Sequence, residues 1–105
     1  MSKQEKKDYL TLYRLQQPKI DSAKRLMRSD ISQYDTYINI LKNAENLRSK
    51  IEGEIGSIED NVSREILFSK YILGMSLESI AESLSYSKRQ VERLHGKALE
   101  KFNIQ

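Results

Sequence analysis

The chain has 105 residues, of which 31% are charged and 38% hydrophobic, with a formal net charge of +3 and no cysteine. These values suit one small domain, or a small domain with an appended element, and they exclude a disulfide framework and a thiolate metal site. The only histidine is His95, which excludes a histidine-rich metal site and a catalytic histidine pair.

One proline and four glycines, with no sustained alternation of apolar and polar residues, predict an all-α fold. The first helix covers residues 3–17. Pro18 either ends or kinks it, because proline lacks a backbone donor and clashes with the preceding turn. Helical character resumes at residue 19 and continues to about Arg28, and residues 29–33 supply capping side chains for the next helix.

The longest predicted helix covers residues 32–58. Its apolar residues recur at intervals of three or four and form one stripe along about seven turns. This spacing favours a helical hairpin or short bundle over a long supercoil. We expect residues 1–58 to be an oligomerisation segment that forms a homodimer or a higher oligomer through this helix and the first one. The expected interface residues are Tyr34, Ile38, Leu41, Leu47, Ile51 and Ile55. The alternative is a monomer in which this helix folds back on Leu10, Tyr13 and Leu26.

The sequence "GSIED" at residues 56–60 marks the expected boundary to a second domain, residues 59–105. This domain is predicted to hold three helices. The first covers residues 61–73 and is stopped by Gly74. Ser76 caps the second helix at residues 77–84, and Ser87 caps the third at residues 88–102.

The last two helices match the spacing of a helix-turn-helix, in which apolar residues flank the turn and a small residue lies where the helix axes approach. Ala81 is that small residue. The apolar positions are Ile80, Leu84, Tyr86, Val91 and Leu94. Ser85 occupies a position where this pattern usually has a left-handed glycine, at a cost of roughly 1 kcal/mol.

The two helices differ in charge. Residues 76–87 hold two acids and no base, whereas residues 87–105 hold five bases and two acids. At 100° per residue, Arg89 and Arg93 lie opposite the buried Val91. Arginine bonds bidentately to guanine and lysine neutralises phosphate, so we expect the last helix to enter the major groove of DNA. The expected DNA-binding residues are Ser87, Lys88, Arg89, Gln90, Arg93 and Lys97.

Three further features have structural interpretations. We expect His95 to be a half-buried packing residue with one hydrogen bond. Gly96, on the outer side of the last helix, either allows close approach of a phosphate or reflects neutral drift. The N-terminal lysines are interrupted by acids, which favours a solvated face over a DNA-contacting arm. These lysines are Lys3, Lys6 and Lys7.

The sequence "REILFSKYILGMSLESIAESLSYSKRQVERLHGKALEKF" resembles the fourth conserved region of bacterial primary sigma factors, which reads promoter −35 elements. The closing "RLHGKALEKF" and the preceding "YS" are more similar to small phage regulators of the ArpU/RinA type, which activate late or packaging genes. The resemblance covers residues 61–102 and is only architectural over residues 1–58. It implies that Lys88, Arg89 and Arg93 face bases and backbone. It also implies a different target sequence, because Arg89 stands where sigma factors commonly carry an acid.

The main hypothesis is therefore a sequence-specific regulator of transcription that binds double-stranded DNA, encoded by a phage or prophage. The alternatives are a sigma-like or anti-sigma adaptor that binds host RNA polymerase, and a phage packaging component that captures DNA. No motif for catalysis is present, so we expect neither an enzyme nor a cofactor. The polar N-terminus and the absence of a long apolar run predict a protein of the bacterial host cytoplasm, associated with the nucleoid.

Overall fold

The computed structural model describes residues 1–104, and every regular element in that range is helical. The elements are α1 (Lys3–Ser29), the 3₁₀ turn η1 (Ile31–Gln33), α2 (Tyr34–Gly56), α3 (Asn61–Leu67), the π-helical turn η2 (Phe68–Ile72), α4 (Leu77–Leu84) and α5 (Lys88–Lys101). The prediction of an all-α fold is confirmed.

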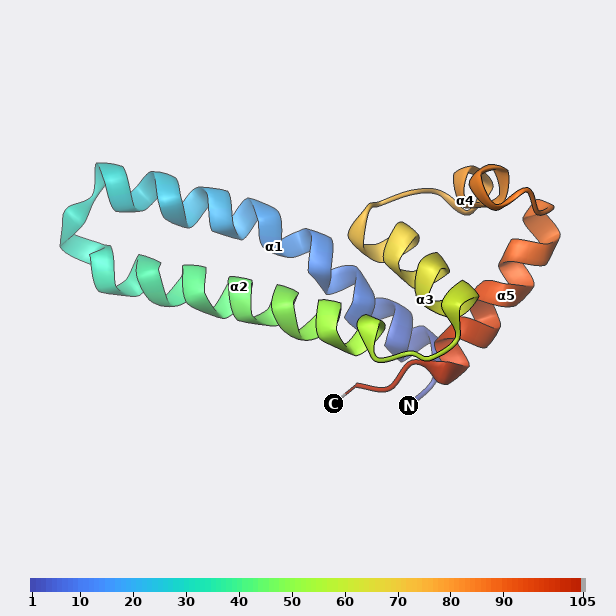
Figure 1. Cartoon of the computed structure of the whole chain (residues 1–105). Helices are drawn as coiled ribbons and strands as arrows, with labels where there is room; N and C mark the ends of the chain where they lie inside the picture. Colours follow the sequence, from blue (N-terminus) through green and yellow to red (C-terminus); the bar gives the residue numbers. More distant parts are fainter. Residues whose placement is uncertain (105) are drawn as a thin grey trace.

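The two long helices lie side by side and run in opposite directions, and they extend away from the shorter helices (Figure 1). The molecule is elongated, with extents of 53 × 27 × 21 Å. Helix α1 begins at a capping box, in which Ser2 and Glu5 satisfy each other's backbone N–H groups. It continues through Pro18, which is exposed, so Pro18 does not end the helix. The chain reverses direction only at residues 30–33.

Polar contacts between α1 and α2 supplement the packing of the two helices. The Tyr9 hydroxyl donates to Glu54, and the Tyr13 hydroxyl donates to Glu52. Glu54 is only 2% exposed, and Lys50 Nζ lies 2.9 Å from its second carboxylate oxygen. A buried carboxylate is costly unless it is paired, so these partners are what make the position of Glu54 tolerable.

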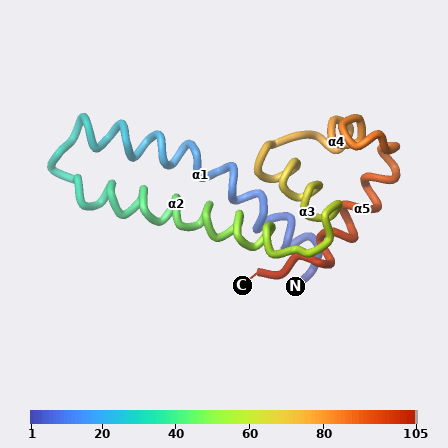
Figure 2. The backbone as a smooth tube through the Cα atoms, viewed as in Figure 1, coloured from blue at the N-terminus to red at the C-terminus, as the bar shows by residue number. Residues whose placement is uncertain are grey.

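The main hydrophobic core joins the base of the long hairpin to the C-terminal helices. Its buried residues come from α1, α2, the linker after α2, α3, η2 and the region of α5, and Figure 2 shows how the chain returns to bring these segments together. They are Leu10, Tyr13, Ile51, Ile55, Ile58, Leu67, Tyr71, Ala98, Leu99 and Phe102. The main core therefore takes residues from both sides of residues 56–60, where the chain changes direction.

This core corrects part of the predicted oligomer interface. Ile51 and Ile55 are 0% and 1% exposed within the single chain, because they pack against Leu10, Tyr13 and the C-terminal helices. They are core residues and offer no surface to a second chain. Leu47 is partly buried against the same core. Of the predicted set, Tyr34 is exposed and both Ile38 and Leu41 are partly exposed.

The helix predicted at residues 61–73 differs from the structure. Helix α3 ends at Leu67, and the backbone then widens into the π turn η2, in which the Leu73 N–H donates to the Phe68 carbonyl at 3.1 Å. An α-helix and a π turn both place Tyr71 near the side that buries Leu67, so the apolar spacing does not distinguish them. Gly74 follows at φ +75°, and the chain leaves the helix there.

Candidate nucleic-acid interface

Helices α4 and α5 begin in the same way. Ser76 and Ser87 both have extended backbones, and each hydroxyl accepts a hydrogen bond of 3.1 Å from the backbone N–H three residues later. Such caps satisfy one of the N–H groups that a helix start leaves without a partner. The two serines therefore fix where each helix starts.

The turn between the helices depends on Ser85, which adopts the left-handed conformation at φ 59° and ψ 37°. The Tyr86 N–H then donates to the Ala81 carbonyl at 2.9 Å, which closes the C-terminus of α4. The sequence pattern predicted a left-handed residue at this position, and the structure has it as serine. The direction of α5 relative to α4 is set by this residue.

A second hydrophobic cluster holds the two helices against α3. Its fully buried members are Ile66, Ile80, Ala81 and Val91, with six partly buried residues around them. Ala81 belongs to this cluster and is 4% exposed, as expected where a small residue lets two helices approach closely. Val91 is 0% exposed, so the opposite side of α5 must face outward.

The six predicted DNA-binding residues have different surroundings. Arg89, Arg93 and Lys97 are exposed on α5, and none of these three forms a hydrogen bond or ion pair with another residue in the described range. Gln90 is partly buried. The hydroxyl of Ser87 is used in the cap of α5. These positions leave the two arginines and Lys97 as the residues available to a ligand in solvent.

Lys88 is the exception among the basic residues of α5. Its Nζ lies 3.0 Å from Glu78 Oε1 on α4, and this hydrogen bond raises the pKa of Lys88. Only the crossing of the two helices brings these side chains together, so the sequence alone did not indicate the pair. A phosphate that binds Lys88 would have to compete with Glu78.

His95 lies on the inner side of α5 and is buried more completely than predicted, with the single side-chain hydrogen bond expected of it. Its Nε2 is 2.8 Å from the Tyr71 hydroxyl on η2. Burial, with the nearby charges of Lys70 and Lys7, lowers the pKa of His95 to about 4. Burial also raises the pKa of Tyr71 to about 12. Both groups are therefore neutral at pH 7.

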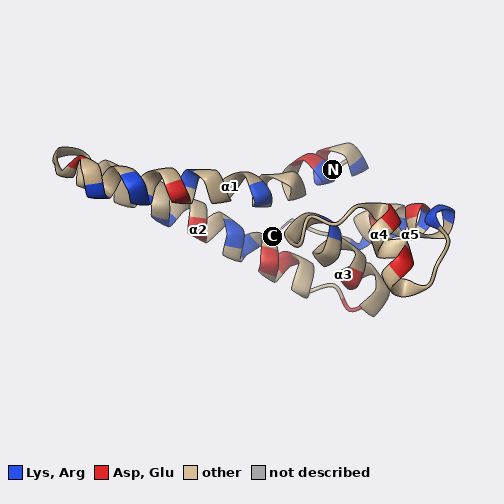
Figure 3. Ribbon diagram, turned by 90° about the horizontal axis from the view of Figure 1, so that it is seen from above, with Lys and Arg blue, Asp and Glu red and all other residues tan. Residues whose placement is uncertain are grey.

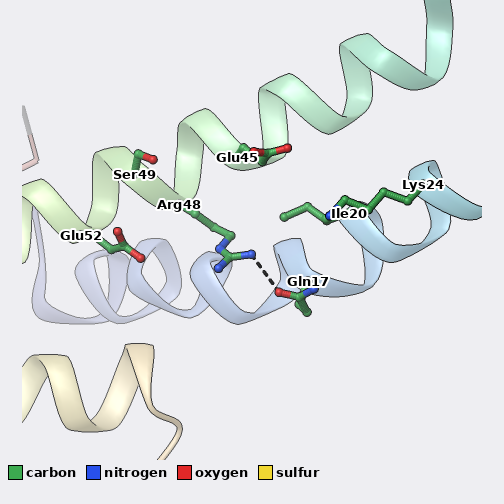
Figure 4. Close-up of a pocket in the computed structure, with 7 residues that line it drawn as sticks. All are labelled: Gln17, Ile20, Lys24, Glu45, Arg48, Ser49 and Glu52. Atoms are coloured by element: carbon green, nitrogen blue, oxygen red, sulfur yellow. Dashed lines mark hydrogen bonds between the residues drawn. The ribbon is translucent and has the colours of Figure 1, made fainter. Parts of the chain in front are cut away.

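A hollow of about 380 Å³ lies between the two long helices, away from α4 and α5 (Figure 4). Its lining residues are Gln17, Ile20, Lys24, Glu45, Arg48, Ser49 and Glu52. The two bases are balanced by two acids, and Arg48 donates a hydrogen bond of 2.8 Å to Gln17 across the hollow. This balance gives no preference for a charged ligand. In residues 1–104, no group of three or more metal-ligating side chains comes together.

No protein-family model, curated protein or solved structure shows significant similarity to this chain. Across the described residues, no helix is long and apolar enough to cross a membrane.

Proposed function

We propose that the protein is a sequence-specific regulator of transcription that binds double-stranded DNA, with α4 and α5 as its helix-turn-helix. In this proposal α5 lies in the major groove, and α4 supports it from outside the groove. The resemblance of residues 61–102 to phage regulators of the ArpU/RinA type supports a role in phage gene expression.

The observation that carries the proposal is the outward face of α5. Arg89 and Arg93 are exposed and lie one turn apart, on the side opposite the fully buried Val91. Arginines in this arrangement can reach the edges of successive base pairs, where guanine offers two acceptors to one guanidinium. Lys97 lies on the flank of the same helix, where it would contact phosphate.

The proposal includes a homodimer, because one helix-turn-helix contacts too few base pairs to find its site among genomic competitors. The buried positions of Ile51 and Ile55 move the proposed interface to the far end of the hairpin. There, Ile31 is 84% exposed, and Tyr34 and Ile40 are also exposed. Pairing two chains through these residues and Ile38 would remove apolar surface from water and present two copies of α5.

The direct test is capture of genomic DNA fragments by the purified protein in the absence of RNA polymerase. We expect the captured fragments to share a motif, and two-fold pairing predicts that its half-sites are related by dyad symmetry. Fragments without any common motif would contradict a sequence-specific regulator. Binding that requires added polymerase would favour the adaptor instead.

A further inference from the structure

The N-terminal turn of α1 borders the outward face of α5. Lys3 Nζ lies 3.1 Å from Glu100 Oε1, and a Cβ atom added at Gly96 would lie 3.5 Å from the same nitrogen. At 100° per residue, Gly96 and Glu100 lie on the same side of α5 as Arg93, roughly opposite Val91. Gly96 follows Arg93 by about 4.5 Å along the helix axis. A ligand on Arg93 therefore comes close to Lys3.

Further basic residues continue from Lys3 along the junction of α1 with η2. A hollow of about 330 Å³ at this junction is lined by Gln4, Lys7, Asp8, Thr11, Arg14, Lys70 and Tyr71. Three of these residues are bases, and the one acid, Asp8, accepts a hydrogen bond of 2.9 Å from the Gln4 amide. Among the described residues, neither Lys7 nor Lys70 forms an ion pair. The hollow therefore carries an excess of positive charge.

The position of this charge is fixed relative to α5. Lys6 Nζ donates a hydrogen bond of 2.8 Å to the Leu99 carbonyl of α5. Arg14 Nη1 donates to the Ile72 carbonyl at the end of η2, at 3.2 Å. Leu10, between them, is fully buried in the main core. Helix α1 is thus attached to α5 and to η2 on either side of its basic residues.

We propose that Lys3, Lys7, Arg14 and Lys70, here called the basic seam, bind the phosphate backbone of DNA next to the groove occupied by α5. This inference rests on the proposed function. Figure 3 shows basic positions at the N-terminal end of α1 and on α5. Lys3 to Arg14 spans about 16 Å of α1, which is enough for more than one phosphate of a strand. Lys3 is paired with Glu100 as Lys88 is with Glu78, so a phosphate that binds Lys3 would have to compete with that carboxylate, whereas Lys7 and Lys70 have no such competitor among the described residues.

Double-stranded DNA is favoured over an acidic protein because the seam adjoins α5. The approach of Lys3 to Gly96 brings the Lys3 end of the seam beside the outward face of α5, so a single extended polyanion can contact both. Phosphate contacts carry no sequence information, but they fix the orientation of the protein on the duplex. The seam would therefore contribute affinity and positioning, and Arg89 and Arg93 would supply the selection of sequence.

The test compares two double variants that lose the same charge. The seam variant combines Lys3→Gln with Lys7→Gln. The control variant combines Lys24→Gln with Lys42→Gln, in the far half of the hairpin. Affinity for a captured duplex is measured by fluorescence anisotropy across a range of salt concentrations. The seam variant should lower the slope of log affinity against log salt by about one to two units, because each phosphate contact contributes about 0.9 and Lys3 shares its charge with Glu100. The preference for the captured duplex over a scrambled one should not change. The control variant should keep the wild-type slope.

If the seam variant keeps the wild-type salt slope while Arg93→Ala still weakens DNA binding, the basic seam is overturned and the proposed function stands. An equal loss of slope in the control variant also overturns it, because net charge alone would then explain the effect. If the seam variant keeps its DNA slope but no longer binds a polyglutamate probe that the wild type binds, the seam belongs to an acidic protein partner. A wild-type protein that binds no DNA overturns the proposed function itself. Circular dichroism on both variants confirms that helicity is retained.

Discussion

Tyr71 and His95 are connected by a 2.8 Å contact between the phenol oxygen and Nε2, although 24 residues separate them in the chain. The two rings are also stacked, with centroids 5.8 Å apart. The pair joins the π turn η2 to the inner side of α5. It therefore helps to hold the helix that carries the proposed DNA-binding residues.

The burial of His95 predicts that stability falls as the solution is acidified. The pKa is about 4 in the folded protein and 6.5 for an ordinary histidine, so the unfolded chain binds more protons between these values. The free energy of unfolding should be highest above about pH 6.5 and should decrease as the pH falls toward 4. Protonation places a charge in a buried site that already faces Lys70 and Lys7.

Thermal unfolding of the wild type and His95→Gln between pH 7 and pH 4.5 measures this effect. The variant should be less stable at pH 7 but should lose less stability on acidification, since only the histidine contribution is removed. Carboxylates titrate in both proteins and so cancel in the difference. Parallel pH profiles for the two proteins would show that His95 does not titrate as its burial implies.

The left-handed backbone of Ser85 predicts a stabilising substitution. Glycine adopts φ 59° without the steric cost that serine has, although it loses more entropy on folding. Ser85→Gly should therefore raise the free energy of unfolding by about 0.5–1 kcal/mol. Ser83→Gly, within α4, is the matched control and should lower it by about 0.5 kcal/mol. Urea denaturation provides both values, and destabilisation by Ser85→Gly would contradict the turn geometry.

At Gly74, in contrast, a substitution should destabilise the protein. Its φ is +75°, and a Cβ there would lie 2.5 Å from the guanidinium of Arg14, which bonds to the Ile72 carbonyl. Gly74→Ala should cost about 2 kcal/mol, from backbone strain and the displaced arginine. In contrast, nothing lies within 4 Å of a Cβ at Gly53, inside α2. Gly53→Ala should therefore stabilise the protein by about 1 kcal/mol.

Combining Gly74→Ala with Arg14→Ala separates the backbone strain at residue 74 from the cost of displacing Arg14. Each substitution is destabilising alone, and the double variant should be more stable than their sum predicts, because the clash no longer exists. Additive effects in denaturant unfolding would mean that the Arg14 side chain moves away from a Cβ at residue 74 without cost.

The sequence predicted local features that depend on nearby residues. The serine caps of α4 and α5, the left-handed residue at Ser85 and the helix stop at Gly74 all follow from local backbone requirements. The inward position of Val91 followed from helical periodicity.

Features set by contacts distant in sequence were not predictable in the same way. The stripe of residues 32–58 does not show which part is covered by the same chain, so Ile51 and Ile55 were wrongly assigned to an interface between chains. The approach of Lys3 to Gly96 depends on where α1 crosses α5. The bond between Tyr71 and His95 depends on how η2 packs against α5, which apolar spacing does not reveal.

The exposed end of the hairpin predicts a dimer in solution. Light scattering after size exclusion, at micromolar concentration, should give about twice the mass of one 12.3 kDa chain. Ile38→Asp should shift the protein toward monomer, because it places a charge in the proposed apolar contact. Leu15→Asp is the control, since Leu15 is an exposed leucine of α1 outside the proposed interface. A mass near that of one chain, unchanged by Ile38→Asp, would rule out the dimer.

Mobility shifts on a duplex captured from genomic DNA measure whether the outward face of α5 reads the sequence. Arg89→Ala and Arg93→Ala should each weaken specific binding by about 1–3 kcal/mol, and Lys97→Ala should reduce the salt slope by about one unit. Arg25→Ala, which removes an exposed arginine from α1, should leave binding unchanged. Wild-type affinity in both Arg89→Ala and Arg93→Ala, with the helical content intact, would show that α5 is not the helix that reads DNA.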